Sequence, residues 1–227
     1  AESALFDGLA YARGVPVTYR GEGYSGLLLG AFVTEGFFDL LGTPAALGRL
    51  LVSEDYAPQA EAAALLSERA WRSYFGSDPA IIGTTLTIGE RLFTVVGVMP
   101  QSFAYPDWGA DNDLWFPISQ LPEAERAALN QRAFGADSRV LARIGQGADP
   151  SEARLALGNI ANGLAAAYPE AYAGWTIALD PLKELEIRAV RARLLVLWGA
   201  ALLVLAMCCL NLSNLYLVQG TSRRREY

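Results

Sequence analysis

The pattern of apolar positions separates a mixed body from a continuous apolar segment near the end of the chain. Residues 194–218 form a stretch of 25 residues without a charged side chain, which as a helix is about 37 Å long. A hydrocarbon core of about 30 Å is covered by this length, and a helix this long in a soluble core would carry a polar stripe. The pattern therefore predicts one transmembrane helix within residues 188–220. A buried helix of a soluble protein is the alternative.

The flanks of this segment carry three arginines on each side, at positions Arg188, Arg191 and Arg193 before it and Arg223, Arg224 and Arg225 after it. The two counts are equal, so the positive-inside rule does not assign an orientation. Asn211 and Asn214 lie near the second end, and we interpret them as helix–helix contacts because amides within membranes commonly join neighbouring helices. The first residue is not Met and the last residues are charged. We expect a fragment of a longer membrane protein, with a cleaved precursor as the alternative.

The first part of the body predicts two strands, at 15–20 and 27–33, joined by the G-x-G-x-x-G sequence of residues 21–26. A dinucleotide-binding fingerprint must lead from a strand into a helix, whose N-terminus receives the pyrophosphate. Strand-like residues follow here instead. The glycines therefore indicate a hairpin loop rather than a nucleotide site.

Helices and a hairpin are predicted in the middle of the body. Residues 35–41 and residues 68–75 are expected to be helical, the second with Ser67 as N-cap and each followed by a glycine. Residues 84–88 and 91–98 alternate around Gly89, which supplies the positive φ of a tight turn. A third helix is expected to start near Pro122.

The last part of the body predicts a strand–helix–strand unit. Residues 138–144 alternate, with Val140, Ala142 and Ile144 on one face and Arg139, Leu141 and Arg143 on the other. Asp149 and Pro150 then provide an N-cap and a first-turn proline for a helix that reaches Tyr168. Alternation at Trp175, Ile177 and Leu179 predicts a second strand. The body is therefore assigned to the mixed α+β class.

Charge is divided as unevenly as hydropathy. Residues 1–187 hold 12 basic and 23 acidic residues, a net charge of −11, whereas residues 188–227 hold six arginines and one acid, a net charge of +5. An acidic body disfavours nucleic acid as a partner, because phosphate binding requires a basic surface. The overall charge of −6 and the apolar fraction of 52% thus average two different parts of the chain.

Missing residue types exclude several classes of enzyme. The sequence contains no His, which excludes Ser-His-Asp hydrolysis, Cys-His proteolysis and the H-E-x-x-H zinc motif within this chain. Its single lysine, Lys183, does not follow a glycine-rich loop, so the Walker A motif is missing. We therefore predict no enzyme activity, no catalytic, cofactor-binding or metal-binding residue, and no cofactor.

A cluster of acidic residues offers the one alternative chemistry. Asp107, Asp111 and Asp113 lie beside Trp108 and Trp115, and paired carboxylates with aromatic residues can serve glycoside hydrolysis. The cluster could also bind Ca²⁺, although the spacing of an EF-hand loop is absent. Loop acids that cap turns are the preferred interpretation. The same interpretation applies to Glu54 and Asp55.

Six segments in order resemble a known family: Phe37–Arg49, Leu65–Trp71, Phe75–Gly83, Phe93–Pro100, Phe103–Pro106 and Asp113–Pro117. Together they are similar to the MacB-like periplasmic core domain of ABC transporter permeases, in the MacB/FtsX family. The subgroup of long duplicated permeases without a fused ATPase is the most similar in type. Ala62–Ala64 replaces a more β-branched strand of the family, and Gly89-Glu90 replaces its common Asn-Gly turn.

The resemblance implies an arrangement in the membrane. The core domain would lie between a first and a second membrane helix, with residues 1–187 in the periplasm of a bacterium and the second helix crossing the inner membrane. Residues 221–227 would begin a cytoplasmic segment. The body would consist of a porter-like subdomain, residues 1–34 and 136–187, and an inserted mixed α/β subdomain, residues 35–135.

The resemblance also implies a function and partners. The chain would be a non-catalytic permease subunit for export or efflux, coupled by mechanotransmission to a separate cytoplasmic ABC ATPase that Arg223, Arg224 and Arg225 would contact. Further partners would be the lipid bilayer and either a second permease half or a homodimer partner. A membrane-anchored ligand-binding or sensor ectodomain is the second hypothesis. An anchored glycosidase that uses Asp107, Asp111 or Asp113 is the third.

Overall fold

The computed structural model describes residues 5–21, 24–103, 105, 111–130, 138–172, 174–182 and 195–210. The chain divides into two compact units, Ala1–Thr176 and Ile177–Tyr227. The strands of the first unit are β1 (Phe6–Arg20), β2 (Ser25–Val33), β3 (Leu47–Gly48), β4 (Ala63–Leu66), β5 (Thr85–Ile88), β6 (Arg91–Val98), β7 (Leu114–Pro117) and β8 (Ser138–Ile144). Its α-helices are α1 (Phe37–Leu41), α2 (Glu68–Phe75), α3 (Glu123–Asn130), α4 (Pro150–Ala167) and α5 (Pro169–Tyr172), and its 3₁₀ helices are η2 (Ser53–Tyr56), η3 (Pro79–Ile81) and η4 (Ile118–Gln120). The unit is therefore mixed α and β, as the sequence predicts.

Six strands close into a small barrel in the order β1, β2, β7, β4, β6, β5 and back to β1. The pairs β2–β7 and β4–β6 are parallel and the others are antiparallel. Closure depends on a short contact in which Tyr19 and Arg20 of β1 pair with Ile88 and Thr87 of β5. Closing the ring pairs strand edges that would otherwise be exposed.

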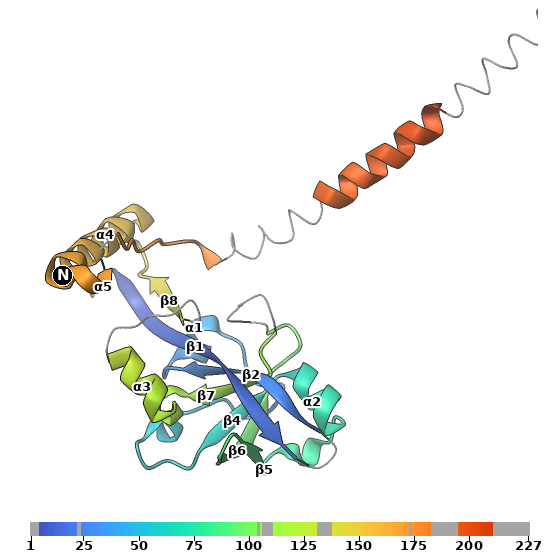
Figure 1. The fold of residues 1–227 in the computed structure, drawn as a ribbon, viewed down its shortest axis with the longest axis vertical. Coiled ribbons are helices and arrows are strands. Elements are labelled where there is room, and N and C mark those ends of the chain that lie inside the picture. The colour runs from blue at the N-terminus through green and yellow to red at the C-terminus, as the bar shows by residue number, and fades with distance from the viewer. Residues whose placement is uncertain are drawn as a thin grey trace, which may run out of the picture. The chain divides into compact units, whose positions relative to one another are not determined.

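The long strand β1 connects this barrel to an outer layer (Figure 1). Its second half pairs with β2, and its first half pairs with β8, up to Arg13. Pro16 lies between that point and Tyr19, where only the β2 side of the strand is paired. A proline is tolerated there because it has no N–H to donate to a second neighbour. The sequence predicted only residues 15–20 as strand, because the pairing of the first half depends on a distant segment.

Two apolar cores lie on opposite faces of β4 and β7. Leu66 and Phe116 belong to the core inside the barrel, while Leu65 and Trp115 belong to a second core that includes Phe37 and other residues around α1. Every residue of β4 and β7 is buried. A strand covered on both faces is apolar throughout rather than alternating, which explains the runs Ala63–Leu66 and Leu114–Pro117.

Local predictions for helix ends and turns are confirmed. The Ser67 hydroxyl accepts a hydrogen bond from the Ala70 N–H at 3.0 Å, which caps α2. Asp149 caps α4 by accepting from the Ser151 N–H at 2.8 Å. Gly89 has a φ of 61° in the turn between β5 and β6. The G-x-G-x-x-G sequence joins two antiparallel strands, in which Arg20 pairs with Ser25, so it is part of a hairpin.

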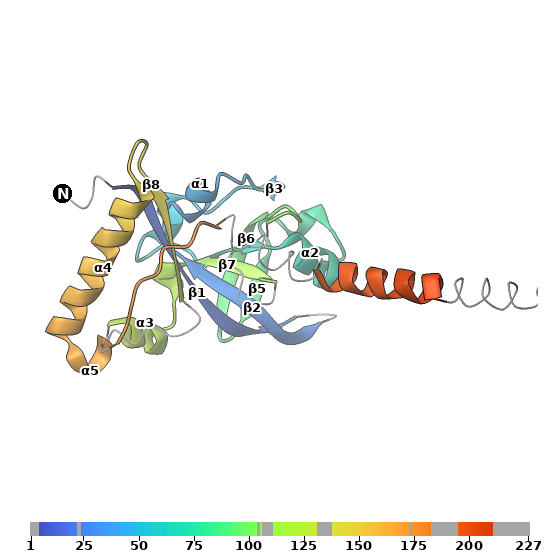
Figure 2. The same ribbon diagram turned by 90° about the horizontal axis from the view of Figure 1, so that it is seen from above.

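The predicted strand at Trp175, Ile177 and Leu179 is wrong. Residues 174–182 contain no strand. The Trp175 N–H donates to the Tyr172 carbonyl at 3.1 Å and the two rings pack edge to face, which continues the turn after α5. Three alternating residues do not form a strand without a neighbour to pair with. The described part of the outer layer is thus strand and helix, shown with α4 beside β8 in Figure 2.

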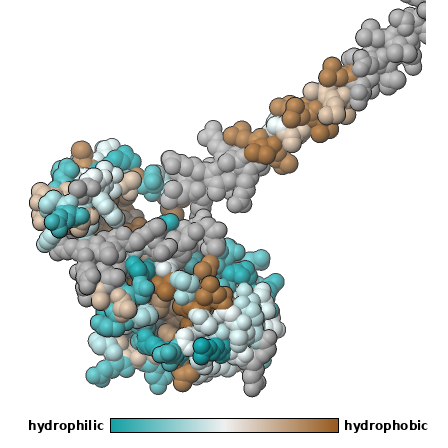
Figure 3. All heavy atoms as spheres, viewed as in Figure 1, coloured by the Kyte–Doolittle hydropathy of each residue, from teal (hydrophilic) through white to brown (hydrophobic). Residues whose placement is uncertain are grey.

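The second unit contains a helix over residues 195–210, whose surface is almost entirely apolar (Figure 3). Among the residues that the structure describes, no helix is both long and apolar enough to cross a membrane. The predicted span thus stays a prediction, as does the division of the body into porter-like and inserted subdomains. Asn211, Asn214 and Arg223–Arg225 lie outside the described residues.

Candidate functional site

A cleft of about 330 Å³ opens beside the start of α2, a volume near the lower limit for small-molecule pockets. Its walls come from the first turns of α2, the loop after β6 and the loop before β7. The lining residues are Ser67, Glu68, Arg69, Arg72, Ser73, Pro100, Gln101, Phe103, Asp111 and Asn112.

Strand pairing brings these three segments together. β4 runs antiparallel to β7, with Leu66 opposite Leu114, so the residues that follow β4 lie next to those that precede β7. The Ser67 N–H donates to the Asp113 carbonyl at 2.8 Å, which fixes the N-cap of α2 against that loop. The Met99 N–H donates to the Leu66 carbonyl at 2.8 Å and places the loop after β6 on the other side.

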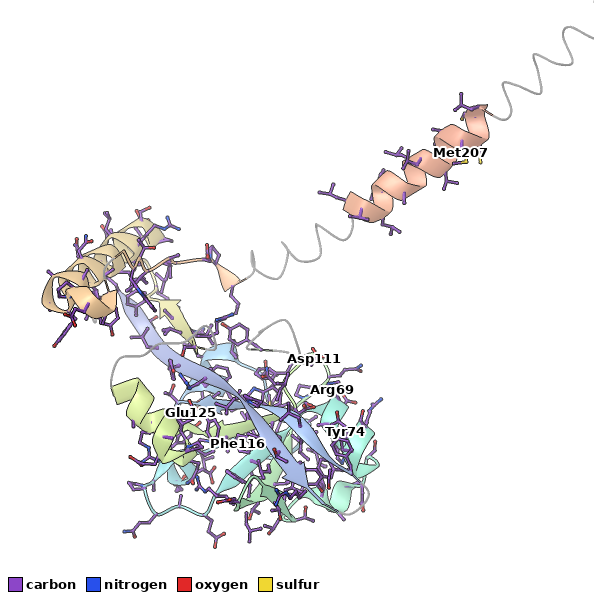
Figure 4. The ribbon with its side chains drawn as sticks, viewed as in Figure 1. Arg69, Tyr74, Asp111, Phe116, Glu125 and Met207 are labelled. Atoms are coloured by element: carbon purple, nitrogen blue, oxygen red, sulfur yellow. The ribbon has the colours of Figure 1, made fainter. Side chains whose placement is uncertain are left out.

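Arg69 organises the charges of the cleft. Its Nη2 lies 2.7 Å from Asp113 Oδ1 and donates to the Asp111 carbonyl at 3.1 Å, while its Nε lies 3.7 Å from Asp111 Oδ2. The other carboxylate oxygen of Asp113 accepts from the Leu29 N–H at 3.0 Å. Arg69 and Asp111 lie together beside α2 in Figure 4. One guanidinium thus joins α2 to both acidic residues and, through Asp113, to β2.

Asp113 is only 3% exposed. Burial is the largest influence and raises the pKa of the Asp113 carboxyl. The Leu29 N–H and the Arg69 charge lower this pKa, the Asp111 charge raises it, and the net pKa is raised. The carboxylate is thus held in place by three elements of the fold. A residue so enclosed cannot reach a sugar, and a glycosidase requires two accessible carboxyl groups. The ion pairs of Arg69 with Asp111 and Asp113 therefore have the geometry of a structural cluster.

Side chains of both charges line the cleft. Glu68 pairs with Arg72 at its rim, so the rim and the Arg69 cluster present both signs of charge. The Ser67 hydroxyl is engaged in the helix cap, and the sequence contains no His to activate a serine. Within the described ranges, no group of three or more His, Cys, Asp and Glu side chains is placed to hold a metal ion.

The structure describes two of the three acids that the sequence grouped, Asp111 and Asp113, and both contact Arg69. Asp113 joins β7 to β2 and α2 rather than capping its own loop, while Asp107 lies outside the described residues. Asp55 does cap a turn, because it accepts from the Val52 N–H at 2.8 Å, and it also pairs with Arg49 at 2.6 Å. Sequence reasoning missed Arg69 as the partner of these acids. The available signal in the sequence was that Arg69 lies in the first turn of the helix capped by Ser67.

The comparisons with known proteins agree with the fold. The family described as MacB-like periplasmic core domain matches residues 4–160. The solved periplasmic region of MacB from Actinobacillus actinomycetemcomitans is 21% identical, with a TM-score of 0.54, over 71% of this chain and 68% of that one. At this identity the likeness shows a shared fold.

Two further solved structures are similar at lower TM-scores. The extracellular domain of the noncanonic ABC-type transporter YknZ from Gram-positive bacteria is 14% identical, with a TM-score of 0.49, over 72% of this chain and 77% of that one. A domain of a putative permease protein from Porphyromonas gingivalis is 18% identical, with a TM-score of 0.49, over 70% of each chain. No curated protein shows significant similarity to the chain.

Proposed function

The chain belongs to the family of MacB-like periplasmic core domains of ABC transporter permeases, and from this membership we propose that it is part of a non-catalytic permease subunit. The observation that carries the proposal is the family match over residues 4–160. ATP hydrolysis belongs to a separate cytoplasmic subunit in this proposal, as the resemblance to permeases without a fused ATPase implies. Residues 194–218 are the membrane helix that follows the periplasmic domain, and residues 221–227 enter the cytoplasm.

The permease transmits motion rather than performing chemistry. β1 supports this proposal, because 15 residues in one strand extend about 50 Å and belong both to the barrel and to the outer layer with β8. A force on either layer reaches the other through a continuous hydrogen-bonded strand. Rigid elements joined at bistable interfaces are the usual means by which domains move together.

Copurification with ABC ATPase subunits tests the coupling. The full-length protein in nanodiscs is expected to retain one of a set of candidate ABC ATPase subunits, and the triple variant Arg223→Glu/Arg224→Glu/Arg225→Glu is expected to lose it. The matched control Arg188→Glu/Arg191→Glu/Arg193→Glu reverses three charges on the other side of the apolar segment and is expected to keep the ATPase. If the control variant alone lost the complex, the orientation would be the reverse. Retention by both variants would contradict a docking role for the arginines.

The cleft beside α2 favours a second candidate, a ligand-binding ectodomain of a membrane-anchored sensor. Its size and mixed charge suit a small polar ligand. The segment that follows Tyr227 in the full gene separates the two candidates, because further membrane spans favour a permease and a kinase or cyclase domain favours a sensor.

A further inference from the structure

Arg13 lies where the long strand β1 passes from the barrel to the outer layer of β8 and α4. Residues from Ala12 onward pair with β2, and residues up to Arg13 pair with β8. In the described structure, residues 14–18 pair with β2 alone until β5 begins to pair at Tyr19. The junction between the two layers is therefore a stretch of strand that is supported on one side.

The sequence of this stretch suits bending. Gly14 directly follows Arg13, and a glycine within a strand weakens it because glycine has the largest conformational freedom. Pro16 has no N–H to donate to a strand on the open side. A second neighbouring strand would stiffen the stretch, and the proline disfavours one.

The side chain of Arg13 lies at the end of the barrel core. Arg13 is paired with Phe32 of β2, and residues directly opposite one another on neighbouring strands place their side chains on the same face. Phe32 belongs to the core inside the barrel. The Arg13 side chain is only 13% exposed, so it brings a largely buried charge to this end of the core. A buried charge requires a partner of opposite sign.

Glu125 of α3 is that partner. Its Oε2 lies 2.5 Å from Arg13 Nη2, and the pair joins residues that are 112 positions apart (Figure 4). The other ion pair and hydrogen bonds of the side chains of residues 123–127 are local, because Arg126 bonds to two carbonyl groups just before the helix and to Glu123 within it. Since α3 follows the barrel strand β7, the Arg13–Glu125 pair connects the barrel to the junction in β1.

The pair is strong but incompletely compensated. Arg13 Nε and Nη1 are buried, and neither makes a hydrogen bond to a described residue. The Tyr11 hydroxyl, two residues away on the same face of β1, bonds to Ser138 Oγ at 2.9 Å. A buried donor without an acceptor costs free energy, which is recovered when the donor reaches water. Opening the pair would hydrate these nitrogens together with Glu125, which lowers the free-energy difference between the closed and open arrangements.

We propose that the Arg13–Glu125 ion pair is a latch that sets the angle between the barrel and the outer layer. In the closed state, α3 holds β1 at Arg13 and restrains bending at residues 14–18. In the open state, the outer layer turns about this one-sided stretch of strand. The inference rests on the proposed transmission of motion through the domain and names the contact that controls it.

The distance between two spin labels tests the latch. The labels are attached to Asn162→Cys on α4 and Thr85→Cys on β5, two exposed positions in the outer layer and the barrel. The full-length protein is used in nanodiscs, with Cys208 and Cys209 replaced by Ala. Pulsed electron double resonance is expected to give one dominant distance. Glu125→Gln is expected to raise the population of a second distance roughly tenfold, because it weakens a hydrogen bond between charged groups.

A substitution on the same helix serves as the matched control. Glu123→Gln removes the same charge from α3, but Glu123 is exposed and pairs with Arg126 of its own helix at 3.5 Å. It is expected to leave the distribution of distances unchanged. Arg13→Met replaces the buried charge and its unpaired donors by an apolar chain. It is expected to raise the second distance as Glu125→Gln does, without lowering the urea unfolding midpoint.

Three results would overturn the proposal. The first is an unchanged distribution of distances in both Glu125→Gln and Arg13→Met. The second is an equal change in Glu123→Gln, which would assign the effect to the total charge of α3. The third is a lower urea midpoint in Glu125→Gln at unchanged distances, which would make the pair a static support of the fold. Copurification with an ATPase does not depend on this pair, so failure of the latch and failure of the permease function are distinguishable.

Discussion

Replacement of Asp113 by Ala tests whether the ion pair beside α2 holds the barrel together. The side chain accepts from the Leu29 N–H at 3.0 Å and from Arg69 at 2.7 Å, and it is buried at the start of β7. Asp113→Ala removes both acceptors and leaves a strand N–H without a partner. A hydrogen bond to a charged group contributes about 1.5–3 kcal/mol.

The two bonds do not contribute equally. The Arg69 side chain is 42% exposed and regains water when its partner is removed, so the ion pair contributes near the lower end of the range. The N–H of the half-buried Leu29 lies between β2 and β7 and regains less water than Arg69 does. We therefore expect Asp113→Ala to lower the free energy of unfolding by about 3 kcal/mol. Asp113→Asn keeps an acceptor for Leu29, and we expect a loss of about 1 kcal/mol.

Urea unfolding of the full-length protein in detergent, followed by tryptophan fluorescence, measures these differences. A cycle with Arg69→Met isolates the ion pair, and we expect a coupling of about 1 kcal/mol between the two positions. Loss of less than 1 kcal/mol in Asp113→Ala, or additive effects of the two substitutions, would refute the reasoning.

The pH dependence gives the same measurement a second readout. Burial raises the pKa of Asp113 above its ordinary value of 3.8, so between these two pKa values the folded protein binds a proton that the unfolded chain does not. The contribution of Asp113 to stability therefore increases as pH falls through the raised pKa and levels off below about pH 4. Asp113→Asn is expected to lack this gain.

Other perturbations test separate parts of the fold. In Gly97→Ala the new Cβ would lie 2.3 Å from the Arg49 carbonyl oxygen, so we expect the free energy of unfolding to fall by about 2–3 kcal/mol. Gly158→Ala on α4 has open space around the new Cβ, and urea unfolding should show a gain of about 0.5–1 kcal/mol. Burial acts to raise the pKa of Asp55, but hydrogen bonds from Arg49 and the Val52 N–H outweigh it and the net pKa is lowered. The stability that Asp55 contributes is therefore lost as pH falls below about 4, which is opposite to the behaviour of Asp113. The urea unfolding midpoint of Asp55→Asn should not show this loss between neutral and acid pH. Trp115→Ala removes a fully buried ring and should lower the free energy of unfolding by about 3–5 kcal/mol in a thermal or urea melt. A smaller loss would show that the second core relaxes around the substitution.

Elements governed by neighbouring residues could be predicted from the sequence. The Ser67 cap of α2, the Asp149 cap of α4 and the Gly89 turn all depend on contacts within three residues or on the φ of one glycine. The first half of β1 and the absence of a strand at Trp175 could not be predicted in this way. In both cases the deciding factor is whether a distant strand is present to accept the backbone hydrogen bonds.

The candidate site shows the same limit. The sequence identified Asp111 and Asp113 as chemically suggestive, but it grouped them by their distance along the chain. The cleft depends on the pairing of β4 with β7, which brings Arg69 to both acids. The parallel pairing of β2 with β7 aligns Asp113 with Leu29. The sequence carries no local signal for that pairing, because β4 and β7 are apolar on both faces and offer no alternation to fix their register.

The sequence by itself determined the mixed class of the body, most helix ends and turns, the separation of acidic and basic parts, and the resemblance that the family match confirms. These properties depend on residue type, short spacing or summed charge. Only the tertiary structure decided that six strands close into a barrel, that Arg69 joins the acids of one cleft, and that β8 remains at the edge of the sheet. Each of these features depends on which distant segments form hydrogen bonds and ion pairs with one another. In the folded chain, burial of the two apolar cores determines which segments pair.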